Sequence, residues 1–427
     1  MRVFEVGWVN MIELLVYGIG ILLSFFMALA LGMNDAANPT ECAVGAGTIS
    51  MKKAIILFAI FAALGGILLG PFVMKTVDRG LIARDNITQL TQTLGMDESQ
   101  VIGMIVVGSF TAVLSAVLWV VFSTWRGMPV STTHSTIGGV LGFGLVAMPQ
   151  FINWGKFNVV VLSIIISPML SLLLASGLYY FFRGYFQRTK STQQIALLIY
   201  SLIYLLSFGT SFTIFSKTLH WSVIETLVWG SLVSLTLTIG TGYTFKKMYG
   251  KIEVVHAVSY LLIIALVFSA FAFGANDMAN ATAVFATPTQ MLGGMTTTEV
   301  MFLLALLGAA GIAIGGFTWG RRVIMTSAYK VTRLNPLSGA AAEYSNALTV
   351  FLFTIIPVYL IGFGLPISTT HSSIGSIIGV GLAMGGLRGV SKATTGKIMV
   401  FWALTIPAVA LISMTLFWLF SQVIVVA

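Results

Sequence analysis

The chain has 427 residues, of which 57% are hydrophobic and only 8% are charged. Soluble domains are about 25% charged, so this composition predicts an all-α polytopic membrane protein, long enough for roughly ten to twelve membrane segments. The net charge of +9 comes from basic residues in short loops between apolar runs. Positive cytoplasmic loops explain that distribution, so no nucleic acid is expected as a partner. The single cysteine, Cys42, excludes an internal disulfide and a cysteine-based metal site.

Long apolar runs recur along the whole chain. Each is long enough to cross or to enter the hydrocarbon core of a bilayer. The polar stretch 75–100 carries both signs of charge and must lie outside that core. The clearest runs cover residues 14–33, 54–74, 101–125, 157–182, 193–215, 221–245, 254–273 and 398–427.

A polar heptapeptide interrupts the apolar sequence near the start of each half. Gly32–Asn38 reads GMNDAAN, and Gly274–Asn280 reads GANDMAN, 242 residues later, with five of seven positions identical. An ionised Asp at the centre of a membrane helix costs about 2.5–3.5 kcal/mol even on the insertion scale, so two equivalent ones indicate function. Pro39, Gly45 and Gly47 follow the first copy, and we expect them to break the helix around a polar cavity.

A second motif also occurs once in each half. Pro129–Ser135 reads PVSTTHS, and Pro366–Ser372 reads PISTTHS, 237 residues later. Extended to Leu145 and Leu382, the two copies share eleven of seventeen positions. The same two motifs in the same order, at nearly the same offset, indicate a duplicated unit.

The duplication divides the chain into three predicted parts. Residues 1–150 form a first repeat, 151–252 form connecting membrane helices, and 253–427 form a second repeat. The basic clusters 183–190 and 246–251 are separated by two spans, so both are expected in the cytoplasm. The two repeats then start on opposite sides of the membrane. We therefore expect two inverted repeats with discontinuous or re-entrant helices and a midplane site between them.

The doubled Gly-x-Asn-Asp-x-x-Asn motif resembles the signature of the inorganic phosphate transporter (PiT) family, over essentially the whole chain. The resemblance implies a multi-pass protein of the plasma membrane that imports inorganic phosphate by symport with sodium or protons. It also implies a homodimer with a complete pathway in each protomer. No enzyme activity and no cofactor are expected, apart from sodium as the coupling ion.

The Asn-Asp motifs carry the oxygen ligands that a hard cation such as sodium prefers. Carboxylates come from the two aspartates, amide carbonyls come from the asparagines, and unwound backbone supplies further carbonyls. For any single asparagine, an interhelical hydrogen bond is an equally good interpretation. The expected sodium-binding residues are Asn34, Asp35, Asn38, Asn276, Asp277 and Asn280.

The Ser-Thr-Thr triplets suit an anion instead, because hydroxyl groups donate to phosphate oxygens. A helix that starts right behind them adds free N–H groups and a positive dipole end. The alternative is that these hydroxyls bond back to the preceding helical turn. The expected phosphate-binding residues are Ser131, Thr132, Thr133, Ser368, Thr369, Thr370 and, from a later apolar run, Asn346.

Five further polar residues are secondary candidates. His134 and His371 follow the triplets as possible anion donors, proton carriers or packing residues. Glu343 and Ser345 precede Asn346 without a match in the first half, and Glu41 has the same status.

Charge favours the coupling to cations. Two carboxylates and a phosphate in one buried site need compensating cations, because uncompensated buried charge is very costly. Sodium meets that need, and a proton-coupled phosphate or metal-phosphate symporter remains an alternative. An anion channel is a weaker alternative, since the two half-sites lie within one chain. An intramembrane hydrolase has little support, because Ser131 and His134 have no third, orienting acid nearby.

Overall fold

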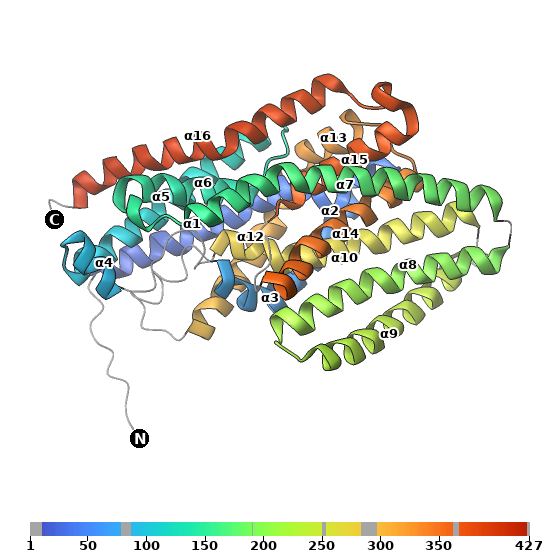
Figure 1. Ribbon diagram of the computed structural model, residues 1–427, viewed down its shortest axis with the longest axis horizontal. Coiled ribbons are helices and arrows are strands. Elements are labelled where there is room, and N and C mark those ends of the chain that lie inside the picture. Colours follow the sequence, from blue (N-terminus) through green and yellow to red (C-terminus); the bar gives the residue numbers. More distant parts are fainter. Residues whose placement is uncertain are drawn as a thin grey trace.

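The computed structural model describes residues 11–77, 87–189, 191–249, 253–282, 297–361 and 367–424. The regular elements within these ranges are all helical (Figure 1). The α-helices are α1 (Met11–Asp35), α2 (Ala37–Gly45), α3 (Met51–Val77), α4 (Ile87–Leu94), α5 (Glu98–Trp125), α6 (Thr132–Ala147), α7 (Trp154–Arg188), α8 (Thr192–Thr213), α9 (Val223–Tyr249), α10 (Val254–Thr282), α12 (Thr297–Thr318), α13 (Gly320–Lys330), α14 (Pro336–Ile361), α15 (Thr369–Gly385) and α16 (Lys392–Ile424). Short 3-10 or π turns occupy η1 (Pro149–Phe151), η2 (Ile214–Thr218) and η4 (Gly386–Arg388).

Eight spans in the described part of the chain are long and apolar enough to cross a membrane, the continuous pair α1–α2 counting as one. The pair α12–α13, bent by 60° next to Trp319, makes a ninth if it counts as one broken span. The all-α, polytopic class is thus confirmed. Within the described ranges, α6 and α15 are not among the long spans, because they have only 16 and 17 residues. At 1.5 Å per residue they extend about 25 Å, which is shorter than a bilayer core of about 30 Å.

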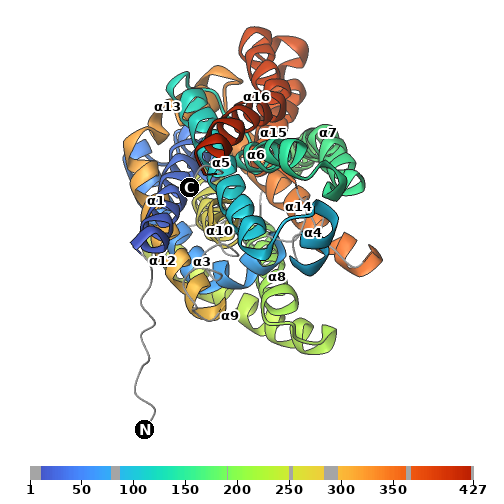
Figure 2. The same cartoon turned by 90° about the vertical axis from the view of Figure 1, so that its left-hand side faces the viewer.

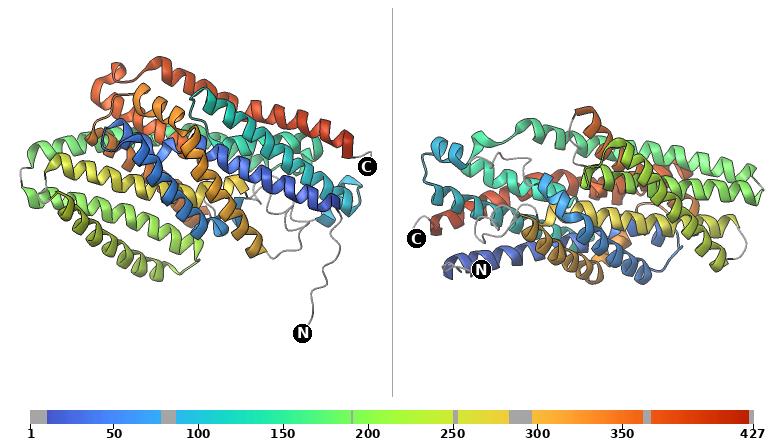
Figure 3. Two further views of the ribbon diagram at one scale, coloured as in Figure 1. Left: turned by 180° about the vertical axis from the view of Figure 1, so that it is seen from behind. Right: turned by 90° about the horizontal axis from the view of Figure 1, so that it is seen from below.

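The helix that carries the second Asn-Asp motif lies in the middle of the bundle. Seen end-on, α10 is surrounded by other helices (Figure 2), and it packs on α3, α14, α2 and α8. At the edge of the bundle, α8 and α9 form a hairpin (Figure 3). The last turns of α7 and α9 lie at the same end of the molecule (Figure 1). Arg188 and Lys246 are on these turns, so the two basic clusters lie at one end of the molecule, as expected from the sequence. Lys190 and Lys251 fall outside the described residues.

Around the Asn-Asp motifs, helices of each half pack against helices of the other half. Helix α1 of the first half packs on α12 of the second, and α10 packs on α3. The first residue of each heptapeptide makes the closest approach. A Cβ atom at Gly32 would overlap the Ile312 carbonyl, and one at Gly274 would overlap the Ala62 carbonyl. Glycine at these places lets the helix backbones touch, as in other membrane bundles.

The helices behind the Ser-Thr-Thr triplets exchange partners in the same way. Helix α6 packs on α16, and α15 packs on α7. Here too the contacts run through glycine: Gly138 lies against the Ile406 carbonyl and Gly375 against the Pro168 carbonyl. The two glycines occupy equivalent positions of the repeated motif. Helices α1 and α10 run in opposite directions, and so do α6 and α15 (Figures 1 and 3).

The helix around the first Asn-Asp motif is less broken than the sequence suggested. Only Ala36 separates α1 from α2, and the second motif lies inside the unbroken helix α10. Pro39 falls in the first turn of α2, where a missing N–H is tolerated. It still leaves the Asp35 carbonyl without its helical donor. Gly45 is the last residue of α2, and Gly47 has a φ of 70° in the turn that follows.

Candidate functional site

The Ser-Thr-Thr triplets lie at the N-termini of two helices, as the sequence predicted. Ser131 is the N-cap of α6, and its hydroxyl oxygen accepts a hydrogen bond from the His134 N–H at 3.2 Å. Ser368 caps α15 in the same way, accepting from the His371 N–H at 3.1 Å. Each serine keeps its own O–H free to donate, so both helix starts can present donors to an anion.

The Asp35 carboxylate lies between the two triplets. Thr132 of α6 donates to Asp35 Oδ2 at 2.7 Å, and Thr370 of α15 donates to Asp35 Oδ1 at 3.1 Å. The aspartate is the last residue of α1 and is 1% exposed. One carboxylate of the first half therefore holds hydroxyl groups from both halves.

Asn38 and Asp277 complete this contact region. The Asn38 amide nitrogen donates to the hydroxyls of Thr369 and Thr370, at 3.2 and 3.1 Å. Thr369 in turn donates to Asp277 Oδ2 at 3.4 Å. Asp277 comes from α10, and its side chain is buried. Asp35 and Asp277 each accept a hydrogen bond from a threonine of the second triplet, so the two aspartates lie on either side of it. The side chains of Asn276 and Asn280 are not among those that the structure describes.

Asn34 holds the segment that leads into α6. Its amide oxygen accepts from the Val130 N–H at 3.0 Å, and its amide nitrogen donates to the Thr124 hydroxyl and the Met128 carbonyl at 2.9 and 3.1 Å. The side chain expected as a sodium ligand therefore positions the first triplet. No sequence signal pointed to this role, because Thr124 lies outside both repeated motifs.

The two histidines pack against each other at the junction of the helix starts. The ring centroids of His134 and His371 are 4.8 Å apart. His371 also stacks on Trp402 at 3.8 Å, and the Trp402 indole donates to the Pro129 carbonyl at 3.0 Å. This arrangement fits a packing role, in which Trp402 fixes the start of one triplet to the histidine of the other.

The remaining candidates lie in a neighbouring polar cluster. Ser345 donates to the Ser171 carbonyl at 2.6 Å. The Glu343 carboxylate accepts a hydrogen bond from Ser269 of α10, also at 2.6 Å. Asn346 is buried, and its amide oxygen has no hydrogen-bond partner among the described residues. Ser373 joins this cluster to the Asn-Asp motif, because its hydroxyl contacts both Glu41 and the Asn38 carbonyl. Thr133, the third residue of the first triplet, is half-buried.

The site is electrostatically negative. Asp35 and Asp277 are both buried carboxylates. The partners of Asp35 are neutral threonine hydroxyls, and a negative charge buried beside neutral groups favours a cation nearby. Hydroxyl and carboxylate oxygens converge there, which is the kind of ligand that a hard cation prefers.

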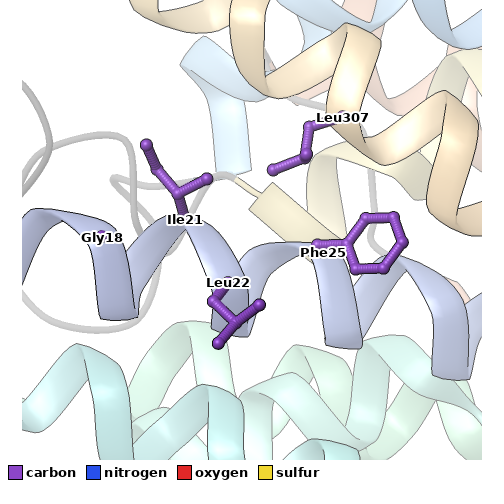
Figure 4. A pocket seen from close by; sticks show the side chains of 5 residues that line it. All are labelled: Gly18, Ile21, Leu22, Phe25 and Leu307. Carbon is purple, nitrogen blue, oxygen red and sulfur yellow. The ribbon is translucent and has the colours of Figure 1, made fainter.

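A surface hollow between α1 and α12 is a different kind of place. Its lining consists of Gly18, Ile21, Leu22, Phe25 and Leu307, whose side chains carry no polar atom (Figure 4). It offers no donor to an anion and no oxygen to a cation, so the buried polar region is the candidate site.

Comparisons with known proteins agree with this geometry. The sequence model of the phosphate transporter family matches residues 31–413, a stretch that includes all four motifs. The chain belongs to the phosphate transporter family. It is therefore a multi-pass plasma-membrane transporter rather than an enzyme, and the resemblance seen in the motifs is confirmed.

Members of the phosphate transporter family resemble the chain along its length. A candidate phosphate permease of Thermococcus kodakarensis is 36% identical, covering 93% of this chain and 96% of its own. One of Pyrococcus abyssi is 33% identical with the same coverage. A solved structure described as the sodium-dependent phosphate transporter has 30% identity and a TM-score of 0.83, covering 96% of this chain and 99% of that one.

Proposed function

We propose that the protein imports inorganic phosphate by symport with sodium ions, through alternating access around a site between its two halves. The observation that carries the proposal is the buried Asp35 carboxylate, which accepts hydrogen bonds from Thr132 of one triplet and Thr370 of the other. The family and the sodium-dependent structural relative support phosphate and sodium as the pair of solutes.

The sodium ions bind at the Asn-Asp motifs. Asp35 and Asp277 supply carboxylate oxygens, and the amide oxygen of Asn38 and the threonine hydroxyls supply neutral ones. Pro39 leaves the Asp35 carbonyl without its helical donor, which adds a backbone ligand at the break between α1 and α2. Asn276 and Asn280 remain predicted ligands of the second motif. Asn34 acts mainly by holding the start of α6.

Phosphate binds between the two helix starts. The N-termini of α6 and α15 face the same threonine–aspartate contacts, so their free N–H groups and positive dipole ends favour an anion there. Ser131 and Ser368 donate their O–H groups, together with Thr132, Thr133, Thr369 and Thr370. Asn346 remains a predicted contact.

The hydrogen bonds at Asp35 suggest how the two solutes are coupled. A threonine hydroxyl that donates to Asp35 cannot donate the same proton to phosphate. A sodium ion on the carboxylate takes the place of that proton and coordinates the hydroxyl oxygen. The O–H is then free to turn toward the anion. Sodium therefore raises the affinity for phosphate, and phosphate raises the affinity for sodium by the same factor.

The alternating-access step rests on two inverted repeats. Their reciprocal packing (α1 on α12, α10 on α3, α6 on α16, α15 on α7) and opposite helix directions support this arrangement (Figure 1). The boundaries 1–150, 151–252 and 253–427 and the homodimer stay predictions, and proton coupling stays the alternative.

Reconstituted vesicles test the proposal. Purified protein should take up labelled phosphate when sodium is higher outside, and uptake should fall to background when choline replaces sodium. Asp35→Asn should take up little phosphate in either buffer. Uptake driven equally well by a proton gradient without sodium would favour the proton-coupled alternative and overturn the sodium assignment.

A further inference from the structure

Two glutamates outside the Asn-Asp motifs are completely buried in the bundle. Glu41 on α2 is 0% exposed, and Glu343 on α14 is 1% exposed. Ser373 donates to Glu41 Oε1, and Ser269 donates to Glu343 Oε1 at 2.6 Å. The second oxygen of each carboxylate, Oε2, is buried and has no hydrogen-bond partner among the described residues. Each carboxylate therefore has one oxygen satisfied by the protein and one left open.

The two glutamates act on each other. The negative charge of Glu343 repels that of Glu41, and Cys42, the neighbour of Glu41, lies in contact with the Glu343 side chain. Helices α2 and α14 pack together and bring the two residues to the same region. Two like charges this close, both removed from water, cannot both stay ionised without a compensating positive charge.

The surrounding helices provide hydroxyls but no cation. Helix α15 contributes Ser373 and helix α10 contributes Ser269, and the α13 residue Ser327 places its buried hydroxyl beside Glu41. The other titratable groups facing the pair are Cys42 and Tyr344, neither of which can carry a positive charge. No ion pair in the described part of the chain reaches either glutamate.

The local backbone favours a proton over a sodium ion as the missing charge. Sodium takes several oxygen ligands, and backbone carbonyls usually supply part of them at helix breaks. Glu41 and Glu343 lie inside α2 and α14, whose carbonyls are used within the helices. A proton needs one carboxylate oxygen, and each residue offers an open Oε2.

We propose that Glu41 and Glu343 form a proton-binding site that is separate from the sodium site at Asp35. A proton on the open Oε2 of either glutamate neutralises that carboxylate and removes the repulsion between the pair. Ser373 connects this site to the sodium site, because the same hydroxyl contacts Glu41 and lies 3.3 Å from the Asn38 carbonyl. Its link to transport rests on the proposed function, whereas its proton content does not.

Infrared spectroscopy of the purified protein in lipid tests the proton content without any transport. The wild type at neutral pH should show the carbonyl stretch of a protonated, buried carboxylic acid, which shifts in D₂O. The band should remain in Asp35→Asn and in Glu253→Gln, a control at an exposed carboxylate. It should be lost in the double variant Glu41→Gln, Glu343→Gln.

Three results would overturn the proposal. The wild type could show no such band at neutral pH, an observation that needs no variant to fold. The band could persist unchanged in the folded double variant. Sodium added at constant pH could abolish the band in both the wild type and Asp35→Asn, which would make the pair a sodium site.

A transport measurement tests the link to the cycle. Sodium-driven phosphate uptake into vesicles is compared for the wild type and the double variant across pH, in identical phosphate buffers. The titration of phosphate itself is then the same for both proteins. The wild-type profile should change with pH more steeply than the variant profile. Parallel profiles would overturn the link to transport, while loss of sodium dependence in the wild type would instead contradict the proposed function.

Discussion

Thr370 donates a hydrogen bond to the Asp35 carboxylate at 3.1 Å, across 335 residues of sequence. The aspartate ends α1 in the first half, and the threonine is in the first turn of α15 in the second. This contact joins the expected cation motif of one half to the expected anion motif of the other. A change of hydrogen-bond partner at Asp35 therefore also affects Thr370. The proposed symport requires such a link between the cation motif and the anion motif.

Removal of this hydroxyl should uncouple the two solutes. In Thr370→Val, phosphate affinity at saturating sodium should fall roughly ten- to hundredfold, because a hydrogen bond to a charged group contributes about 1.5–3 kcal/mol. Without sodium the affinity should change little, since Asp35 already occupies the hydroxyl. Thr415→Val, at an exposed threonine bonded within α16, is the control. Calorimetric titrations with and without sodium measure both numbers, and equal losses in the two buffers would contradict the mechanism.

The cap serines should affect phosphate more than sodium. Ser131→Ala or Ser368→Ala removes one donor to the anion and should weaken phosphate binding roughly tenfold or more. The loss of the N-cap also lowers stability by about 1 kcal/mol. Ser191→Ala is the matched control, because Ser191 precedes α8 without capping it through its side chain. Binding isotherms for sodium and phosphate on the purified variants test this assignment. A variant that loses sodium binding in the absence of phosphate but keeps its phosphate affinity would reverse the assignment of the two motifs.

Asn34 should behave as a positioning residue. Asn34→Ala leaves the buried Val130 N–H and Met128 carbonyl without their partner, which costs about 1–3 kcal/mol. The melting temperature in detergent should drop, and phosphate affinity should fall because the start of α6 moves. Sodium affinity measured without phosphate should fall less than in Asp35→Asn. A stable Asn34→Ala protein with selectively lost sodium binding would make Asn34 a direct ligand.

The close helix contacts through glycine predict a matched pair of stability defects. Gly138→Ala and Gly375→Ala place a methyl group against the carbonyls of Ile406 and Pro168, and overpacking of this kind costs about 1–3 kcal/mol. Gly177→Ala in α7 meets no atom within 4 Å and should not destabilise the protein. Thermal unfolding in detergent compares the three. Unequal effects of the two equivalent glycines would argue against symmetric packing of the repeats.

The sequence alone supported the class of the protein and the position of its motifs. Repetition was visible because Asn, Asp, Ser and Thr stand out in apolar surroundings, and the helix starts at Ser131 and Ser368 followed from cap chemistry. The exchange of packing partners was not visible. Apolar helices show no preferred neighbour in their composition, and the glycine contacts that decide it depend on the tertiary structure.

The site was predicted in its members but not in its contacts. Asp35 and Thr370 were expected in separate sites for the cation and the anion, and the structure places them in direct contact. Thr124 and Trp402 were missed because they lie outside the repeated motifs. Ser373 was missed although it follows the second Ser-Thr-Thr-His-Ser directly, because the prediction rested on the triplets themselves. The expected helix break is limited to Ala36, the one residue between α1 and α2, because Pro39 lies in the first turn of α2, where a helix tolerates proline.

The most direct test of the account is the sodium dependence of phosphate affinity in the wild type and in Asp35→Asn. Phosphate binding to purified protein is titrated at a series of sodium concentrations, with choline keeping the ionic strength constant. The wild type should bind phosphate more tightly as sodium rises, and Asp35→Asn should bind it weakly with no dependence on sodium. An Asp35→Asn variant whose phosphate affinity rises with sodium as in the wild type would contradict the claim that this carboxylate couples the two solutes.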